Sequence, residues 1–117
     1  STMVKEKAGA IIVGLDPFFI SQRRQIAELA AKNRLPSIST FREYAEDGGL
    51  MTYGQNLADQ YRSIANFVDK IFKGAKPADL PVEQSTKLDM VINGKTAKAL
   101  KLNISKEMLM RADKVIE

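Results

Sequence analysis

Continuous apolar runs and helical periodicities divide the chain into an alternating series of predicted strands and helices. Residues 8–15 form an apolar run that is too short for a buried helix and is typical of a strand covered on both faces. A helix is predicted from Phe18 to Asn33, and the segment from Leu35 to Thr40 is the next short strand. Strand, helix and strand in this order predict a βαβ unit with a right-handed crossover.

The middle of the chain carries the strongest helical pattern. A short helix over 41–47 is predicted to end at Gly48-Gly49, and a brief strand over 50–53 to end where Gly54 turns the chain. Asn56 then caps a helix that ends at Gly74. Its apolar positions recur every three or four residues, at Leu57, Tyr61, Ile64, Val68 and Ile71. We expect this stripe to be core or a subunit face.

The last third predicts one more strand and two short helices. Leu88, Met90 and Ile92 alternate with other residues, which favours a half-exposed strand. Asn93-Gly94 reads as a turn, residues 95–100 as a short helix, and Ser105 as the cap of a final one. The whole chain therefore predicts a three-layer α/β fold, with a small, mostly parallel sheet of about four strands flanked by helices. Such a small sheet leaves an open edge or face.

Composition excludes several classes of site. The chain has 117 residues, one domain's worth, with 44% hydrophobic residues, a net charge of +4, and neither His nor Cys. Cys–His and Ser–His nucleophiles, thiolate or imidazole zinc sites and disulfides are therefore absent. The glycines form neither a dinucleotide-binding nor a Walker A pattern. We expect no metal, no cofactor and no enzymatic activity.

The basic residues and the chain's apolar runs also argue against other partners. The densest basic stretch has no interleaved aromatic residues and is typical of a solvated face, so we expect no nucleic-acid partner. Its lysines are Lys87, Lys95, Lys98, Lys101 and Lys106, opposed only by Asp89. No apolar run approaches the length of a membrane span, and residues 1–7 are interpreted as a lead-in or tag remnant.

Candidate binding residues follow the first predicted strand. Asp16, Phe18 and Phe19 lie at its carboxyl end, where open α/β sheets place their ligands. Asp16 either holds an amine or only caps the next helix, since the two roles are compatible. For the adjacent phenylalanines we expect one core residue and one site residue, because neighbouring helix positions point apart.

Further candidates follow the second and third predicted strands. Arg42 faces the same rim and either clamps a carboxylate or pairs with a neighbouring Glu on the surface. Tyr53 lies in the glycine-rich stretch 48–54 and either presents its hydroxyl to a ligand or packs.

Two stretches resemble a known family. "REYAEDGGLMTYG" and "KGAKPADLPVEQSTKLDMVINGKTAKAL", within a similarity from Ala8 to about Glu117, resemble the C-terminal part of ABC-transporter substrate-binding proteins. The branch is the tryptophan/tyrosine-type one, with a type I periplasmic-binding fold. The resemblance implies two α/β lobes with ligand in the cleft between them, a periplasmic or extracytoplasmic location, and delivery to a membrane permease.

Carried onto this sequence, the resemblance implies that Asp16 and Phe18 contact ligand from a strand end. It places Arg42 on the cleft rim and Tyr53 near the crossing between lobes. The first lobe and any signal peptide or lipoprotein cysteine have no counterpart here, so residues 1–117 are expected to be a single C-terminal α/β portion.

The expected function is therefore capture of a small solute, such as an amino acid, for an uptake ABC transporter. The alternative is a ligand-sensing domain of a transcription regulator with the same fold. A further expectation is a homodimer, in which the helical segment 55–73 is exchanged across Gly54 to hide the apolar stripe.

Overall fold

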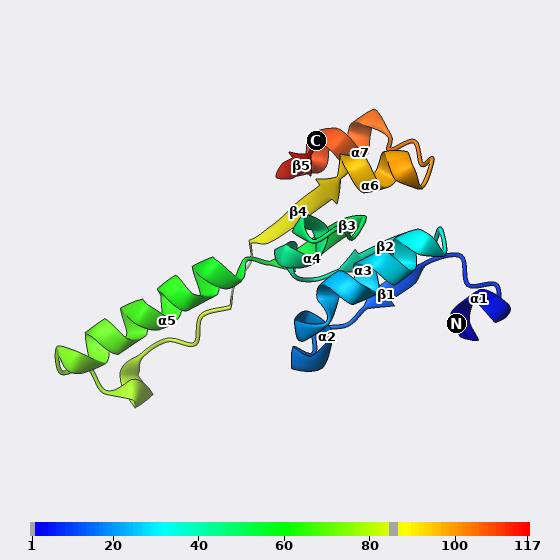
Figure 1. Ribbon diagram of the computed structural model, residues 1–117. Coiled ribbons are helices and arrows are strands. Elements are labelled where there is room, and N and C mark those ends of the chain that lie inside the picture. The colour runs from blue at the N-terminus through cyan, green and yellow to red at the C-terminus, as the bar shows by residue number, and fades with distance from the viewer. Residues whose placement is uncertain (1, 85–86) are drawn as a thin grey trace.

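The computed structural model describes residues 2–84 and 87–117, which form one five-stranded sheet in the order β1-β2-β3-β4-β5 (Figure 1). The strands are β1 (Ile11–Val13), β2 (Ser37–Ser39), β3 (Met51–Gln55), β4 (Leu88–Asn93) and β5 (Lys114–Ile116). β1, β2 and β3 are parallel, β4 is antiparallel to β3, and β5 is parallel to β4. The predicted α/β class with a mostly parallel sheet is confirmed, and β5 is a strand that the sequence pattern did not predict.

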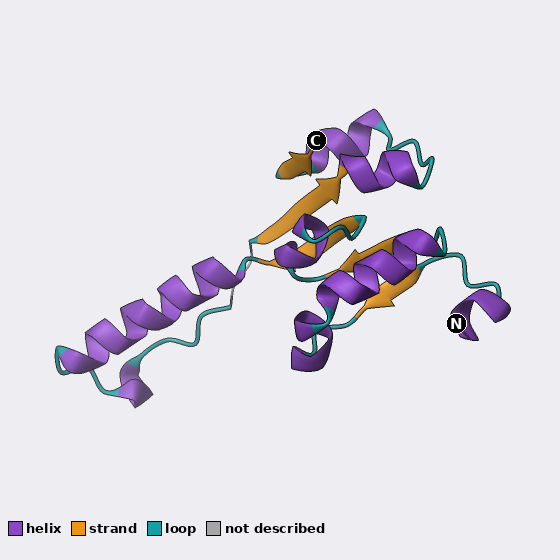
Figure 2. Cartoon of the chain, in the orientation of Figure 1, coloured by secondary structure: helices purple, strands orange, loops and turns teal. Residues whose placement is uncertain are grey.

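Several helices pack beside the sheet, whereas the long central helix and the short N-terminal helix lie away from it (Figure 2). The helices are α1 (Thr2–Lys5), α2 (Pro17–Ser21), α3 (Arg23–Lys32), α4 (Arg42–Glu46), α5 (Leu57–Phe72), α6 (Gly94–Ala99) and α7 (Lys106–Arg111), with a 3-10 turn η1 (Pro77–Asp79). None of the described helices is long and apolar enough to span a bilayer.

The single helix predicted from Phe18 to Asn33 is wrong, because the chain leaves helical geometry at Gln22 and forms α2 and α3 instead. The Arg23 side chain donates to the Ile20 carbonyl at 3.0 Å. Its Nε also lies 2.7 Å from a carboxylate oxygen of Asp47. These contacts hold the junction between the two helices, and periodicity alone does not reveal them.

The core lies on one face of the sheet, beneath α3 and α4. A row of side chains crosses β1–β4 on this face, and each is at most 5% exposed. The row consists of Val13, Ser39, Thr52 and Val91. Tyr44 from α4 packs against Val13 in the same cluster and donates its hydroxyl to Ser37 Oγ at 2.8 Å. Burial raises the pKa of the Tyr44 hydroxyl, which therefore stays a neutral donor.

The opposite face of the sheet is covered only in part. Ile12 in β1 points to this face and is 83% exposed, so the prediction of a first strand covered on both faces is wrong. Further along the same row, Ile92 in β4 is fully buried. The face therefore changes from buried at β4 to open at β1, where no described helix covers it.

Helix α5 extends away from the sheet as an arm (Figure 1). Asn56 caps it and Gly74, at φ 104°, follows its end, as the sequence predicts. None of its described residues is buried. The radius of gyration of 17.7 Å exceeds the roughly 13 Å expected for a compact chain of this length. The apolar stripe of α5 is therefore not part of the core of this chain.

Candidate functional site

The carboxyl ends of β1, β2 and β3 meet at one edge of the sheet, where the chain forms a pocket of about 340 Å³. Its lining comes from the residues after β1 and β2, the end of β3, the start of α5 and the start of β4. These residues are Leu15, Thr40, Phe41, Tyr53, Gly54, Gln55, Leu57, Gln60 and Leu88. An apolar wall with a few amide and hydroxyl groups is the usual make-up of a small-molecule site.

Among the predicted site residues, Tyr53 lines this pocket. Alternation along β3 buries Thr52 in the core and directs Tyr53 to the other face, where it is 47% exposed. Tyr53 also borders a groove of about 520 Å³ with Met90 of β4 and Met108 of α7. Tyr53 therefore borders both hollows.

Gly54 is part of β3 and does not turn the chain, which corrects the expectation from the sequence. It pairs with Asp89 of β4, and a Cβ at this position would lie 2.1 Å from the Thr40 carbonyl oxygen. Glycine is needed here because the backbone after β2 passes directly against β3 beside the pocket.

Asp16 lies beside the pocket residue Leu15 and caps α2. The Phe18 backbone N–H donates to Asp16 Oδ1 at 2.8 Å. The capping role is therefore present, and it leaves the second carboxylate oxygen for another partner.

The phenylalanines of α2 do not divide into one core and one site residue. Phe18 and Phe19 are 66% and 41% exposed, with ring centroids 5.9 Å apart in an edge-to-face arrangement. Ile20 is the residue of α2 that packs against the core. Neither ring lines the pocket at the sheet edge, and both project from the same helix beside it.

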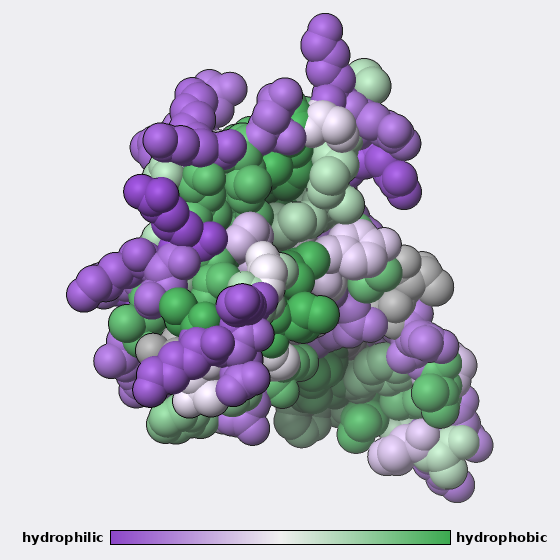
Figure 3. All heavy atoms as spheres, turned by 90° about the vertical axis from the view of Figure 1, so that its right-hand side faces the viewer, coloured by the Kyte–Doolittle hydropathy of each residue, from purple (hydrophilic) through white to green (hydrophobic). Residues whose placement is uncertain are grey.

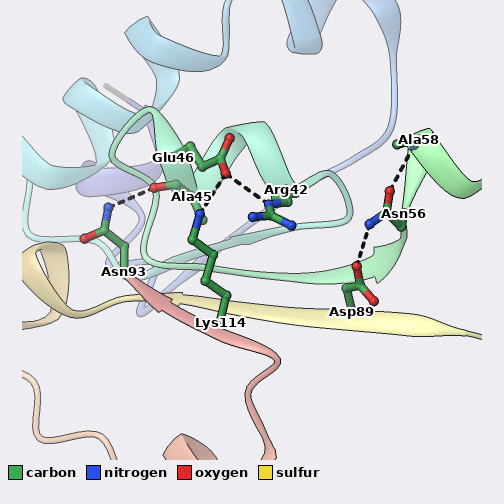
Figure 4. Close-up of polar contacts among 8 residues, drawn as sticks. All are labelled: Arg42, Ala45, Glu46, Asn56, Ala58, Asp89, Asn93 and Lys114. Atoms are coloured by element: carbon green, nitrogen blue, oxygen red, sulfur yellow. Dashed lines mark hydrogen bonds and ion pairs between the residues drawn. The ribbon is translucent and has the colours of Figure 1, made fainter. Parts of the chain in front are cut away.

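Arg42 begins α4 and takes part in an ion-pair cluster (Figure 4). Glu46 Oε1 accepts from Arg42 Nε at 3.0 Å and lies 3.3 Å from Lys114 Nζ in β5. The hydrogen bond from Arg42, aided by Lys114, holds the pKa of the Glu46 carboxyl below its ordinary value. The surface pairing weighed for Arg42 is thus present, and Arg42 does not line the pocket.

Several pocket residues were not predicted from the sequence, including Leu15, Thr40 and Leu88. Each lies next to the end of a predicted strand. Their position at the edge of the sheet could therefore have indicated them as pocket residues, whereas their side-chain chemistry could not. Gln55 and Gln60 come from the junction of β3 and α5, and their side chains are hydrogen-bonded to each other. Only the tertiary arrangement brings this junction over the ends of β1 and β2.

Other chemistry finds no support in the part of the chain that the structure describes. No cluster of three or more His, Cys, Asp or Glu side chains there is suited to hold a metal ion. Lys95, Lys98, Lys101 and Lys106 are all exposed. Hydrophilic side chains project into solvent at the top of the molecule, above α6 and α7 (Figure 3).

Comparison with known proteins decides the family. The profile of the family described as ABC transporter substrate binding protein matches residues 1–116. The chain belongs to this family. It is a family of substrate-binding proteins and not of enzymes. No curated protein sequence is significantly similar to the chain.

Three solved structures share the fold. An ABC domain from Streptococcus pneumoniae in complex with L-Trp is 29% identical with a TM-score of 0.87, covering 98% of this chain and 40% of that one. A conserved domain protein from Vibrio cholerae is 25% identical with a TM-score of 0.87, covering 96% and 38%. CD0873 from Clostridium difficile, a substrate-binding protein in its ligand-free open structure, is 22% identical with a TM-score of 0.66, covering 98% and 39%. The chain thus spans about two fifths of the length of these neighbours.

Proposed function

We propose that this chain is part of a solute-binding protein that captures a small molecule and delivers it to an ABC permease. The pocket at the carboxyl ends of β1–β3 carries the proposal, because parallel sheets present ligands at this edge. The family match supports it, as does the neighbour solved with L-Trp. The ligand class that fits an apolar pocket rimmed by amide groups is an amino acid or a related small molecule.

We further propose that residues 1–117 are the C-terminal portion of a two-lobe protein, with residues 1–7 as its lead-in. Ser1 lies outside the described residues, and the helix α1 has no buried residue. The arm α5 supports the two-lobe arrangement, because most of its apolar stripe stays exposed in the described chain. A first lobe would cover this stripe and close the pocket, as domain closure does in binding proteins. The family places such proteins outside the cytoplasm, in the periplasm or its equivalent.

In the bound state, Asp16 holds a cationic group of the ligand, and Arg42 on the rim orients an anionic one. Tyr53 belongs to the apolar wall of the pocket, and Phe18 and Phe19 contact the ligand from α2, outside that wall. Their exposure supports this role, since each ring has surface that a ligand or a second lobe can cover. No metal or cofactor takes part in this mode of binding.

Replacing Asp16 with asparagine tests the charge separately from the helix cap. The amide oxygen of Asp16→Asn still caps α2, so the fold is retained while the negative charge is lost. In the two-lobe protein we expect about tenfold weaker binding of the amino-acid ligand, equivalent to about 1.4 kcal/mol. Isothermal titration calorimetry with a panel of amino acids that includes L-tryptophan measures the change.

Lys98→Ala is the matched control, because Lys98 is exposed on α6 and distant from the strand ends that form the pocket. Equal and small effects of Asp16→Asn and Lys98→Ala would contradict the site. If no amino acid of the panel binds the unmodified protein, the proposed ligand class is wrong.

The isolated 117-residue chain is proposed to dimerise through α5, in place of the cover that a first lobe supplies. Tyr61 and Phe72 are 71% and 87% exposed, and together they present roughly 300 Å² of aromatic surface. A stable interface buries about 800 Å² per partner. Light scattering after size exclusion is expected to give a dimer that Tyr61→Glu dissociates. A monomer at micromolar concentration would contradict the proposed dimer. Exchange of residues 55–73 between the two copies remains the predicted mode of dimerisation.

A further inference from the structure

The arm formed by α5 depends on its attachment to the sheet for its direction. Helix α5 makes no extensive contact with any other described helix or strand, and none of its residues is buried. Packing therefore does not set the angle between the arm and the sheet. Whatever sets this angle must lie where β3 enters α5 and where the chain returns into β4.

The attachment is a two-stranded ribbon. β3 and β4 remain paired to the base of the arm, with Gly54 opposite Asp89 and Gln55 opposite Leu88. Asn56 is the next residue after β3 and the last before α5. A ribbon of two strands resists bending more than a single connection does, but it twists readily unless side chains join its two strands at the end.

The Asn56 side chain makes this join (Figure 4). Its Oδ1 accepts from the backbone N–H of Ala58 at 2.9 Å, which caps the first turn of α5. Its Nδ2 donates to Asp89 Oδ2 at 2.8 Å, across the ribbon in β4. One amide group thus binds the helix with its acceptor and the neighbouring strand with its donor, and the hydrogen bond to a carboxylate is of the stronger, charge-assisted kind.

We propose that Asn56 is a positioning residue, which sets the direction of α5 relative to the sheet by joining the helix cap to Asp89. The consequence for ligand binding rests on the proposed function. Because the proposed first lobe packs on α5, this join sets the resting angle between the lobes and hence the fraction of molecules ready to bind. The direction of the arm itself is a property of this chain and is measured without any ligand.

Paired substitutions separate positioning from capping. Asp is as good a helix cap as Asn, so Asn56→Asp keeps α5 folded while it removes the donor and places two carboxylates opposite each other. Asp89→Asn alone keeps an acceptor for the Asn56 donor. The double variant Asn56→Asp/Asp89→Asn reverses the pair, so that the new amide at position 89 donates to the new carboxylate at position 56.

Distance measurement between two spin labels reads the direction of the arm. The chain has no native cysteine, so Asn66→Cys on the exposed side of α5 and Lys98→Cys on α6 take the labels specifically. All variants carry Tyr61→Glu, which keeps the chain monomeric, so each distance is measured within one copy. With Asn56→Asp we expect the distance distribution to broaden about twofold, as further arm directions become populated. Asp89→Asn and the double variant are expected to give the narrow distribution of the unmodified chain.

Circular dichroism on the same samples confirms that helix content is unchanged in all variants. The proposal is overturned if Asn56→Asp leaves the distribution narrow, or if the double variant is as broad as Asn56→Asp. Loss of helix content in Asn56→Asp would also overturn it, because Asn56 would then act through α5 stability alone. A ligand-binding failure of the two-lobe protein would affect none of these distances, so the two proposals fail separately.

Discussion

Replacing Tyr44 with alanine is expected to lower the free energy of unfolding by about 3–5 kcal/mol, the usual cost of removing a buried aromatic ring. Tyr44 has no exposed surface, and its ring stacks edge-to-face on Phe41 with centroids 5.9 Å apart. A Cβ at Gly49 would lie 2.2 Å from the same ring, so the backbone of that loop is fitted closely around it. The cavity left by alanine cannot collapse without moving both α4 and this loop.

Urea unfolding followed by circular dichroism measures the loss. Since a domain of this kind has a total stability of about 5–15 kcal/mol, Tyr44→Ala removes a large share of it. Tyr44→Phe isolates the hydroxyl and is expected to cost about 1–3 kcal/mol, because it leaves Ser37 Oγ without its donor in the core. Met110→Ala, at an 80% exposed position, serves as the control and should change stability by less than about 0.5 kcal/mol. A Tyr44→Ala effect as small as that of Met110→Ala would contradict the assignment of the core.

Replacing Gly54 with alanine is expected to lower the free energy of unfolding by about 3 kcal/mol, the upper part of the usual range for an overpacked site. The substitution is also expected to disrupt the pocket. The added methyl group would meet the backbone carbonyl of Thr40 at 2.1 Å, and a backbone atom cannot rotate away as a side chain would. β2 and β3 must therefore separate at their carboxyl ends, where the pocket lies. Faster hydrogen exchange at the amide of Tyr53, which faces β2, with a lower urea midpoint, is the expected result.

Gly14→Ala is the matched control for Gly54→Ala. Gly14 also follows a strand at the same edge, but a Cβ there meets no atom within 4 Å. We expect a change in stability of less than about 0.5 kcal/mol for this variant. Similar effects of the two substitutions would show that the approach of Thr40 to Gly54 does not constrain the sheet.

Much of the fold was predictable because the sequence patterns are local. Local sequence predicts the apolar stripe of α5, its Asn56 cap and its end before Gly74, and the structure confirms all three. The short apolar run and the segment after Leu35 predicted β1 and β2 in the same way. The family resemblance is likewise confirmed by the profile match over residues 1–116.

The candidate site was less predictable, because its geometry depends on contacts between distant segments. Asp16 and Arg42 were chosen as strand-end residues, and the structure places one in a helix cap and the other in an ion pair with Glu46 and Lys114. Tyr53 lines the pocket, together with Leu15, Thr40 and Leu88, which come from three other parts of the chain. A role for Asp16, Phe18, Phe19 and Arg42 in binding stays a prediction.

The sequence by itself determined most of the helices and strands, the α/β class and the family, because propensity, capping and periodicity act over a few residues. It did not reveal β5 or the break between α2 and α3. Only the tertiary structure decided that β4 runs antiparallel to β3, that Gly54 lies against Thr40, and that the described part of the chain leaves the stripe of α5 unburied. These features follow from pairing and packing between segments up to dozens of residues apart. The energies of these contacts depend on which surfaces meet, and a local sequence pattern does not specify which distant surfaces come into contact.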